Sequence, residues 1–472
     1  MKRSSTHLLI LVCLIVRIVT LSSCANIIPP GGGPRDSLPP RLISAAPRDS
    51  AVNVATKNII LSFDEYITLQ NPTDLIVSPA PSPQGLPVID YKLRNVIVKL
   101  KELDSNTTYS LNFGDIIRDV NEGNIAKNFI YAFSTGKTID YNTYSGKLLL
   151  AETGKPQADS SLLIVLHRNL DDTAVKKSYP RYYAKLNGRG EFIFHNLPKG
   201  NFAVYAVDNR FTKKYDDSTQ FFAFRSTPVI IGTNTPIDTL YAYQEVKRAS
   251  GNTTVNNTSA RPAGINKEVD KRLKYGVDLD NGQQDILNNM TLVFNRKLTN
   301  FDSTKFILYD TSFNKLNGSS FSLDSGKTKV IVKYKWKEGA PYRLLIAKDA
   351  VSDSAAITLT KADTLRFFAK KETEYGSIRL RFANLDLSKN PVLQIVQNDK
   401  VVDSAVLLQP DFQRKLYKPG TYDVRILFDT NKNGVWDPGK FFGAKRQPEI
   451  VYLVPKQIAI RANWDNEVTI TL

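Results

Sequence analysis

The sequence predicts an all-β protein built from tandem antiparallel β-sandwich domains in an A-B-A′-B′ order. Short runs that alternate apolar and polar residues recur along the chain, for example Tyr109-Ser110-Leu111-Asn112-Phe113. This period of two is typical of half-buried strands. Turn residues such as Pro79, Gly85 and Asp104 separate the runs. The pattern of residues 39–246 then returns in the same order later in the chain, which indicates an internal repeat.

The N-terminus predicts a lipoprotein signal. A basic start precedes an apolar stretch from Leu8 to Leu21, which is shorter than the ~20 residues that span a bilayer. The stretch ends in Leu21-Ser22-Ser23-Cys24, which resembles the lipobox of bacterial lipoproteins. The resemblance implies a cleaved signal peptide at 1–23, lipidation of Cys24 and a flexible tether at 24–38. An ordinary signal peptide or an uncleaved anchor is the alternative.

Charge and cysteine content limit the partner classes. The net charge is +17, and loss of the signal segment would leave about +14. The basic residues are scattered among 46 acids without a basic run of five, so we expect no nucleic-acid partner. Attraction to anionic lipid or glycan surfaces stays open. The second cysteine, Cys13, lies inside the signal, so the mature chain would have no disulfide and would be stabilised by burial and hydrogen bonds.

Residues 39–137 contain an ordered series of motifs. They are Pro39-Pro40, the Leu61–Glu65 strand, the pair Thr108-Tyr109, the Asp119–Asn124 turn and a closing Phe133–Gly136. This series resembles the bacterial Ig-like domain of the S-layer-protein type. The resemblance implies a seven-stranded sandwich that acts as a spacer or adhesion module and has no catalytic residues.

Residues 144–246 predict a different sandwich. Phe192 and Phe194 would point to one face, a Leu-Pro-Lys-Gly turn would follow, and Phe202 and Val204 would return to the same core. The segment Gly190–Ala206 resembles the carboxypeptidase-regulatory or transthyretin-like sandwich. The resemblance implies a non-catalytic module.

The second half of the chain repeats the first. A Ser-, Asn- and Thr-rich stretch at 247–264 predicts a linker. Residues 265–371 predict a divergent second Ig-like domain, because Leu292–Leu298 matches Leu61–Ile67 but the Gly-Asn turn is missing. Residues 374–472 predict a second B-type sandwich that contains a possible calcium loop. Periods of ~100 residues in this order predict separate beads on a string.

The possible calcium loop lies in the last domain. Side-chain oxygens stand at positions 1, 3, 5 and 9 and a glycine at position 6, namely Asp429, Asn431, Asn433, Asp437 and Gly434. The spacing resembles EF-hand-like calcium loops, which implies that the carbonyl of Val435 supplies position 7. Lys440 stands where an EF-hand has its bidentate Glu, so a site here would be weak.

The alternative for this loop is a plain Asn-Gly turn between two strands. The corresponding loop of the second domain, Asp208–Asp216, has Arg210 and Lys213 in place of a ligand and the glycine. Both loops end in an aromatic residue followed by Asp. That shared pair indicates a structural role and favours the plain turn.

We expect no enzyme activity. The sequence has no HExxH, GxSxG, CxxC or Gly-rich phosphate loop. His167 and His195 each lie at a predicted strand and are expected to be ordinary sheet residues. Adjacent acids such as Asp64-Glu65 point to opposite faces of a strand and cannot act as an acid–base pair. No catalytic residue is therefore predicted.

A short Asp-Ser or Asp-Thr pattern recurs along the chain. It resembles the O-glycosylation acceptor of Bacteroidetes surface proteins, and common turn residues are the alternative. The hydroxyl residues are Ser37, Ser50, Thr173, Ser218, Thr239, Ser303, Ser354, Thr364 and Ser404.

The whole chain resembles the Ig-like-domain lipoproteins of Bacteroidetes. This implies an outer-membrane lipoprotein of the cell envelope, facing the periplasm or the surface, which acts as a non-enzymatic scaffold, adhesion or interaction module. Its partners would be the membrane, through the lipid anchor, and an unknown protein or glycan. The alternative is a glycan-binding lipoprotein for polysaccharide capture, with Trp336, Trp436 and Trp464 as exposed aromatics, although folded cores would also use three tryptophans. A third reading is an envelope-assembly accessory.

Overall fold

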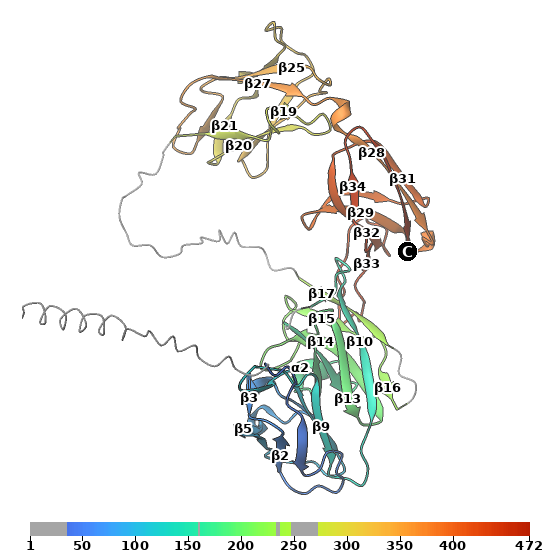
Figure 1. The fold of residues 1–472 in the computed structure, drawn as a ribbon. Coiled ribbons are helices and arrows are strands. Elements are labelled where there is room, and N and C mark those ends of the chain that lie inside the picture. Colours follow the sequence, from blue (N-terminus) through green and yellow to red (C-terminus); the bar gives the residue numbers. More distant parts are fainter. Residues whose placement is uncertain (1–34, 159–160, 233–236, 247–271) are drawn as a thin grey trace, which may run out of the picture.

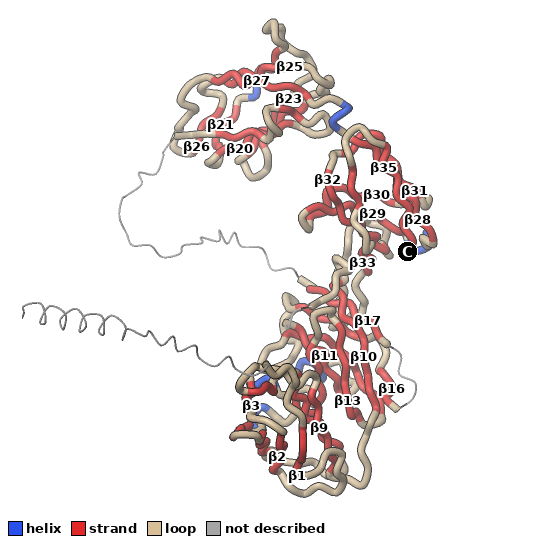
Figure 2. The backbone as a smooth tube through the Cα atoms, viewed as in Figure 1, coloured by secondary structure: helices blue, strands red, loops and turns tan. Residues whose placement is uncertain are grey.

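The computed structural model describes residues 35–158, 161–232, 237–246 and 272–472. Strands dominate these segments and form four β-sandwiches, A, B, A′ and B′, each around its own hydrophobic core (Figures 1 and 2). The predicted fold class is confirmed. The signal segment, Cys24 and the 247–264 linker lie outside the described residues.

Sandwich A has a four-stranded sheet, β1-β2-β6-β5, a three-stranded sheet, β4-β7-β9, and a β3-β8 pair. Alternate residues of both larger sheets, such as Leu61 and Leu111, are fully buried in one core. The structure has more strands than the seven that the resemblance implied, because short pairings add to the sandwich. The strands are β1 (Leu42–Ala46), β2 (Asn58–Phe63), β3 (Ile67–Leu69), β4 (Ile76–Ser78), β5 (Val88–Lys92), β6 (Asn95–Lys99), β7 (Thr108–Gly114), β8 (Ile117–Asp119) and β9 (Phe129–Ser134), with 3-10 turns η1 (Pro72–Asp74) and η2 (Pro83–Gly85).

The Asp119–Asn124 turn of sandwich A is organised by one carboxylate. Asp119 is buried and accepts hydrogen bonds from the backbone N–H groups of Glu122 (2.6 Å), Gly123 (2.9 Å) and Asn124 (2.6 Å). Gly123 has φ 77°, a conformation that glycine adopts without strain. Burial alone would raise the pKa of Asp119, but the backbone donors stabilise the charged form and the net pKa is lowered.

Sandwich B is formed by one curved sheet in the order β12-β11-β14-β15-β17-β10-β13, with β16 on β14. Phe192, Phe194, Phe202 and Val204 share its core, as the sequence predicted. The edge strands β12 and β13 lie next to strands β4 and β7 of sandwich A. The elements are β10 (Asn142–Leu150), β11 (Leu162–His167), α2 (Ala174–Lys177), β12 (Tyr182–Lys185), β13 (Glu191–Leu197), β14 (Gly200–Asp208), β15 (Phe221–Phe224), β16 (Val229–Ile231) and β17 (Asp238–Gln244).

Sandwich A′ repeats A, with sheets β18-β20-β24-β23 and β19-β27-β25-β22 and a β21-β26 pair. Asp353 occupies the position that corresponds to Asp119 and accepts hydrogen bonds from the backbone N–H groups of Ala355 and Ile357, both at 2.9 Å. The turn therefore forms in A′ although its Gly-Asn motif is missing. The strands are β18 (Tyr275–Val277), β19 (Gln283–Gln284), β20 (Met290–Phe294), β21 (Leu298–Phe301), β22 (Phe306–Tyr309), β23 (Ser320–Leu323), β24 (Lys329–Lys333), β25 (Pro341–Ile346), β26 (Val351–Asp353) and β27 (Asp363–Ala369), with η3 (Ser303–Lys305).

Sandwich B′ repeats B, with sheets β30-β29-β32-β33 and β31-β28-β35 and with β34 on β32. Parallel pairs join first and last strands in both copies, β10 to β17 and β28 to β35. The elements are η4 (Glu372–Glu374), β28 (Gly376–Ala383), η5 (Leu387–Lys389), β29 (Pro391–Gln397), β30 (Lys400–Val406), β31 (Asp411–Tyr417), β32 (Gly420–Phe428), β33 (Ile450–Leu453), β34 (Ile458–Ile460) and β35 (Asp465–Thr471).

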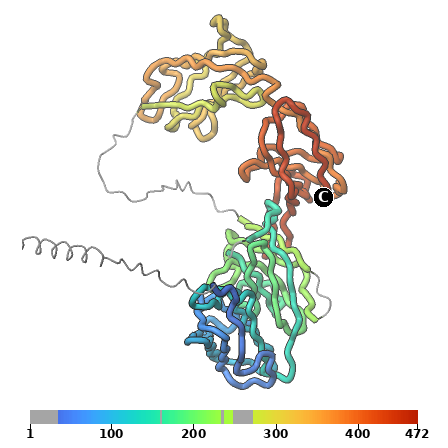
Figure 3. Tube along the Cα trace, in the orientation of Figure 1, coloured from blue at the N-terminus to red at the C-terminus, as the bar shows by residue number. Residues whose placement is uncertain are grey.

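The sandwiches are not independent beads. Figure 3 shows the C-terminal sandwich B′ meeting sandwich B, although A′ lies between them in the sequence. Residues of both sandwiches share one aromatic cluster, which holds Tyr205, Phe222 and Phe441. The beads-on-a-string prediction was wrong on this point because it considered only neighbours in sequence.

Candidate functional site

The B–B′ contact is built by the long loop between β32 and β33. Phe441 of this loop is 2% exposed, and its ring centroid lies 5.1 Å from Phe222, 4.9 Å from Phe224 and 5.6 Å from Tyr205 of sandwich B. Phe442 stacks on Tyr215 at 5.8 Å. The loop therefore covers an aromatic face of B that would otherwise be exposed to water.

Two glycines fit the two sandwiches together. A Cβ on Gly439 would lie 2.6 Å from Cζ of Tyr243, and a Cβ on Gly154 would lie 2.6 Å from the carbonyl oxygen of Val451. Real Cβ atoms do not approach so closely. Each sandwich thus contributes one glycine whose missing side chain makes room for the other, which is the close complementarity of a specific interface.

Polar contacts surround the aromatic centre. The backbone N–H of Val451 donates to the carbonyl of Ala151 at 3.0 Å. Two ion pairs cross the joint, Lys155 with Asp399 at 2.5 Å and Lys445 with Asp172 at 2.7 Å. Arg425 is 3% exposed and lies 3.6 Å from Asp399. The arrangement is reciprocal, because the Ala151–Lys155 turn of B contacts B′ while the Phe441 loop of B′ contacts B.

The predicted calcium loop is the first part of this same loop. Asp429 is buried, and its carboxylate accepts from the backbone N–H groups of Lys432 (2.7 Å) and Gly434 (2.7 Å). The side-chain amides of Asn431 and Asn433 both lie 2.6 Å from Oδ2 of Asp437. Four of the five predicted ligand residues thus converge, while the side chain of Val435 is exposed. The geometry is that of an Asx-rich turn, and calcium binding there stays a prediction.

Glu449 is the residue that the sequence reasoning missed. It is buried, and its Oε1 accepts from the backbone N–H and hydroxyl of Thr430, both at 2.8 Å, while Oε2 accepts from the N–H of Asp437 at 3.0 Å. It ties the two ends of the turn together from a position far along the loop. No local spacing signals it. Within the described residues, no group of three or more His, Cys, Asp or Glu side chains has the arrangement of a metal site.

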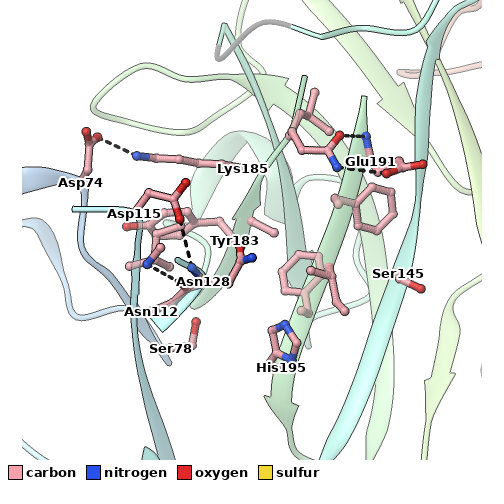
Figure 4. A pocket seen from close by; sticks show the side chains of 18 of the residues that line it. Asp74, Ser78, Asn112, Asp115, Asn128, Ser145, Tyr183, Lys185, Glu191 and His195 are labelled. Carbon is pink, nitrogen blue, oxygen red and sulfur yellow. Dashed lines mark hydrogen bonds and ion pairs between the residues drawn. The ribbon is translucent and has the colours of Figure 1, made fainter. Parts of the chain in front are cut away.

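A candidate binding cavity with a volume of about 1040 Å³ lies between sandwiches A and B (Figure 4). Its A wall carries Asn112, Asp115 and Asn128, and its B wall carries Tyr183 and His195. An ion pair of 2.6 Å between Asp74 and Lys185 crosses the cleft from one wall to the other. The lining is rich in amides and hydroxyls, which suits a polar ligand without strong charge.

The two described histidines show no catalytic arrangement. Burial lowers the pKa of His167 to about 4, so its imidazole is neutral at pH 7, and its Nε2 has no hydrogen-bond partner among the described residues. Burial also lowers the pKa of His195. His167 lies edge-on to Tyr205 at 5.9 Å, as a packed sheet residue does. Neither histidine is hydrogen-bonded to a serine or a carboxylate in the part of the chain that the structure describes.

The tryptophans differ from the expectation of three exposed rings. Trp336 is buried in the A′ core, and its N–H donates to the carbonyl of Asn288 at 3.1 Å. Trp436 is half-buried against the B–B′ cluster, and its N–H donates to the carbonyl of Glu449 at 2.8 Å. Of the three, Trp464 alone is mostly exposed, at 61%, and Cζ of Arg461 lies 5.6 Å from its ring centroid; the expectation of an exposed ring was wrong for Trp336.

The model of the bacterial Ig-like domain family matches residues 36–135, which covers most of sandwich A. No curated protein matches the chain. Across the described ranges, no helix is both long and apolar enough to cross a membrane.

Three solved structures illustrate the structural similarity. Native alpha-2-macroglobulin from Escherichia coli shares 10% identity over 39% of this chain and 72% of its own, with a TM-score of 0.20. The N-terminal part of the bacterial S-layer protein SbsC shares 13% identity over 41% of this chain and 44% of its own, with a TM-score of 0.20. BcpA, the major pilin subunit of Bacillus cereus, shares 10% identity over 70% of this chain and 98% of its own, with a TM-score of 0.17. Scores at this level carry no argument about function.

Proposed function

We propose that this chain is a lipid-anchored cell-envelope protein that acts as a non-enzymatic scaffold or interaction module. The observation that carries the proposal is the reciprocal B–B′ interface, which fixes sandwiches far apart in sequence into one unit. The Ig-like match at residues 36–135 supports the same role, because such domains serve as structural modules. The lipobox-like Leu21–Cys24 supports an anchor that precedes sandwich A.

Metabolic labelling with a fatty acid tests the anchor. We expect label on the chain and its loss in Cys24→Ser. Protease treatment of whole cells next shows whether the sandwiches face outward or toward the periplasm. A chain that carries no acyl group at Cys24 would contradict the anchoring part of the proposal.

A second function, glycan binding, is favoured by the cleft between A and B. Amide groups from A and the Tyr183 ring from B offer hydrogen bonds and a surface for a neutral sugar. Retardation of the protein in gels that contain a neutral polysaccharide tests this function. We expect Asn128→Ala together with Tyr183→Ala to abolish retardation. Equal mobility of the unmodified chain in every polysaccharide gel would exclude glycan capture.

A further inference from the structure

The charge of the chain is unevenly divided between the two Ig-like repeats. Residues 39–137 hold ten Lys and Arg and ten Asp and Glu, whereas residues 272–371 hold seventeen basic and ten acidic residues. The two repeats share a strand of nearly the same sequence, Asn95–Lys99 in β6 and Lys329–Lys333 in β24. The excess positive charge in A′ therefore does not follow from the shared fold.

One row of lysines in A′ extends a shorter row of sandwich A, where Lys99 and Lys101 stand at the positions of Lys333 and Lys335. From Lys329 to Lys337 the side chains alternate, and Val330, Val332, Tyr334 and Trp336 pack into the A′ core. The other side of the same segment is formed by Lys329, Ile331, Lys333, Lys335 and Lys337. All four lysines are exposed: Lys329 and Lys333 are the two ends of β24, and Lys335 and Lys337 lie in the segment that follows it. We call Lys329, Lys333, Lys335 and Lys337 the lysine row.

The lysine row makes few charge contacts within the protein, among them that of Lys329, whose backbone N–H and side-chain charge both help to lower the pKa of Asp324. In the described part of the chain none of the four lysines forms an ion pair; the ion pairs of A′ use other cations. The nearby acids are engaged by backbone donors. Asp278 accepts from the N–H of Thr291, Asp324 from that of Lys329, and Glu338 from that of Glu372. The positive charges are thus available to an external partner.

The surroundings of the lysine row favour a flat partner. The register of the sheet places Thr291 beside Ile331, and Ser320 and Ser322 on the strand beyond, on the same outer face. Because these side chains are short, the longer lysine side chains extend beyond them into the solvent. No aromatic ring lies among these outward residues, so the face lacks the stacking platform that nucleotides and sugars use. Lysine acts as a point charge, whereas arginine forms paired hydrogen bonds to single phosphates.

We propose that the outer face of the β18-β20-β24-β23 sheet in A′ binds an anionic lipid bilayer through the lysine row. Lys329, Lys333, Lys335 and Lys337 would lie at the phosphate headgroups, and the flat sheet would lie along the membrane plane. Binding would be electrostatic, without insertion, and would weaken with salt. The proposal goes beyond the scaffold function and does not depend on acylation of Cys24.

Vesicle co-sedimentation tests the proposal. Every sample uses the chain from Ala25 onward, so that neither the apolar Leu8–Leu21 stretch nor acylation of Cys24 contributes. Vesicles of phosphatidylcholine alone are compared with vesicles that also contain phosphatidylglycerol. We expect binding only to the second kind, and loss of that binding at high salt. Replacing all four lysines by Gln should weaken partitioning by roughly 10²- to 10³-fold, since each lysine near an anionic surface contributes about fivefold.

Two further variants make the outcome specific. Replacing the four lysines by Arg keeps the charge and should keep the binding. Replacing Lys57, Lys92, Lys127 and Lys137 of sandwich A by Gln removes the same charge from exposed positions elsewhere and should change partitioning far less.

The proposal is overturned if the four-Gln variant binds as tightly as the unmodified chain, or if the control variant loses as much binding. It is also overturned if the lysine row binds dextran sulfate but not phosphatidylglycerol vesicles, because the partner would then be a soluble anionic polymer. None of these results bears on whether Cys24 is acylated.

Discussion

Gly439 of sandwich B′ lies against the ring of Tyr243 in sandwich B, where a Cβ would come within 2.6 Å of the ring carbon Cζ. The contact shows that the two sandwiches are shaped for each other at atomic distance. It also makes the interface sensitive to a single added side chain.

Gly439→Val should separate B from B′ without unfolding either sandwich. The isopropyl group cannot fit beside Tyr243, and both cores lie elsewhere. The radius of gyration from small-angle X-ray scattering should rise, while the far-ultraviolet circular dichroism stays unchanged. Gly188→Val is the matched control, because a Cβ on Gly188 meets no atom within 4 Å. An unchanged radius of gyration in Gly439→Val would argue against the interlock.

Phe441→Ala should weaken the same interface by about 3–5 kcal/mol, the usual cost of removing a buried phenyl ring. Phe441 is buried only because it contacts sandwich B. The effect should appear as faster proteolysis of the loop between β32 and β33. Phe313→Ala in A′ is a suitable control, since that ring is 57% exposed. Equal cleavage rates for the unmodified chain and Phe441→Ala would contradict a buried role.

Asp119→Asn should destabilise sandwich A by roughly 1–3 kcal/mol, because three backbone N–H groups lose a charged acceptor. The pKa of Asp119 is lowered in the folded state, so its contribution is present above the unfolded value near 3.9 and is lost as pH falls through the folded pKa. Urea unfolding at a series of pH values should show a difference between the two proteins at neutral pH that shrinks in acid. Glu102→Gln, at an exposed position, should show no such difference.

Calcium at Asp429, Asn431, Asn433, the Val435 carbonyl and Asp437 would raise the melting temperature of B′. With a dissociation constant near 1 mM, ~10 mM calcium would add about 1.4 kcal/mol. Asp437→Asn should remove this calcium response. Asp208→Asn in the corresponding loop of B should not change it. A melting temperature that is the same with and without calcium would leave the plain Asn-Gly turn as the role of this loop.

The sequence was sufficient for the all-β class and for the faces of individual strands. Phe192, Phe194 and Phe202 lie in one core because alternation along a strand fixes the side that each residue takes. The repeat order A-B-A′-B′ could likewise be predicted from the sequence, because A′ keeps the apolar positions of A and B′ keeps those of B.

The contacts between distant segments could not be predicted in this way. Phe441 and Phe442 lie in a loop with no period, and their burial depends on an aromatic face of B far away in sequence. Glu449 closes the Asp429 turn from the far end of the loop, where no spacing rule applies. Trp336 looked like a surface aromatic, yet it fills the core of A′. These four positions are decided by tertiary packing and not by local pattern.

Sandwiches B and B′ form one unit, although A′ separates them in the sequence. Spin labels on Arg189→Cys in B and Lys456→Cys in B′, both exposed, would report the distance between the two sandwiches in a chain whose native cysteines are replaced by serine. Double electron–electron resonance should give one narrow distance distribution, which Gly439→Val broadens. A broad distribution in the otherwise unmodified chain would show that the sandwiches move independently and would contradict the account.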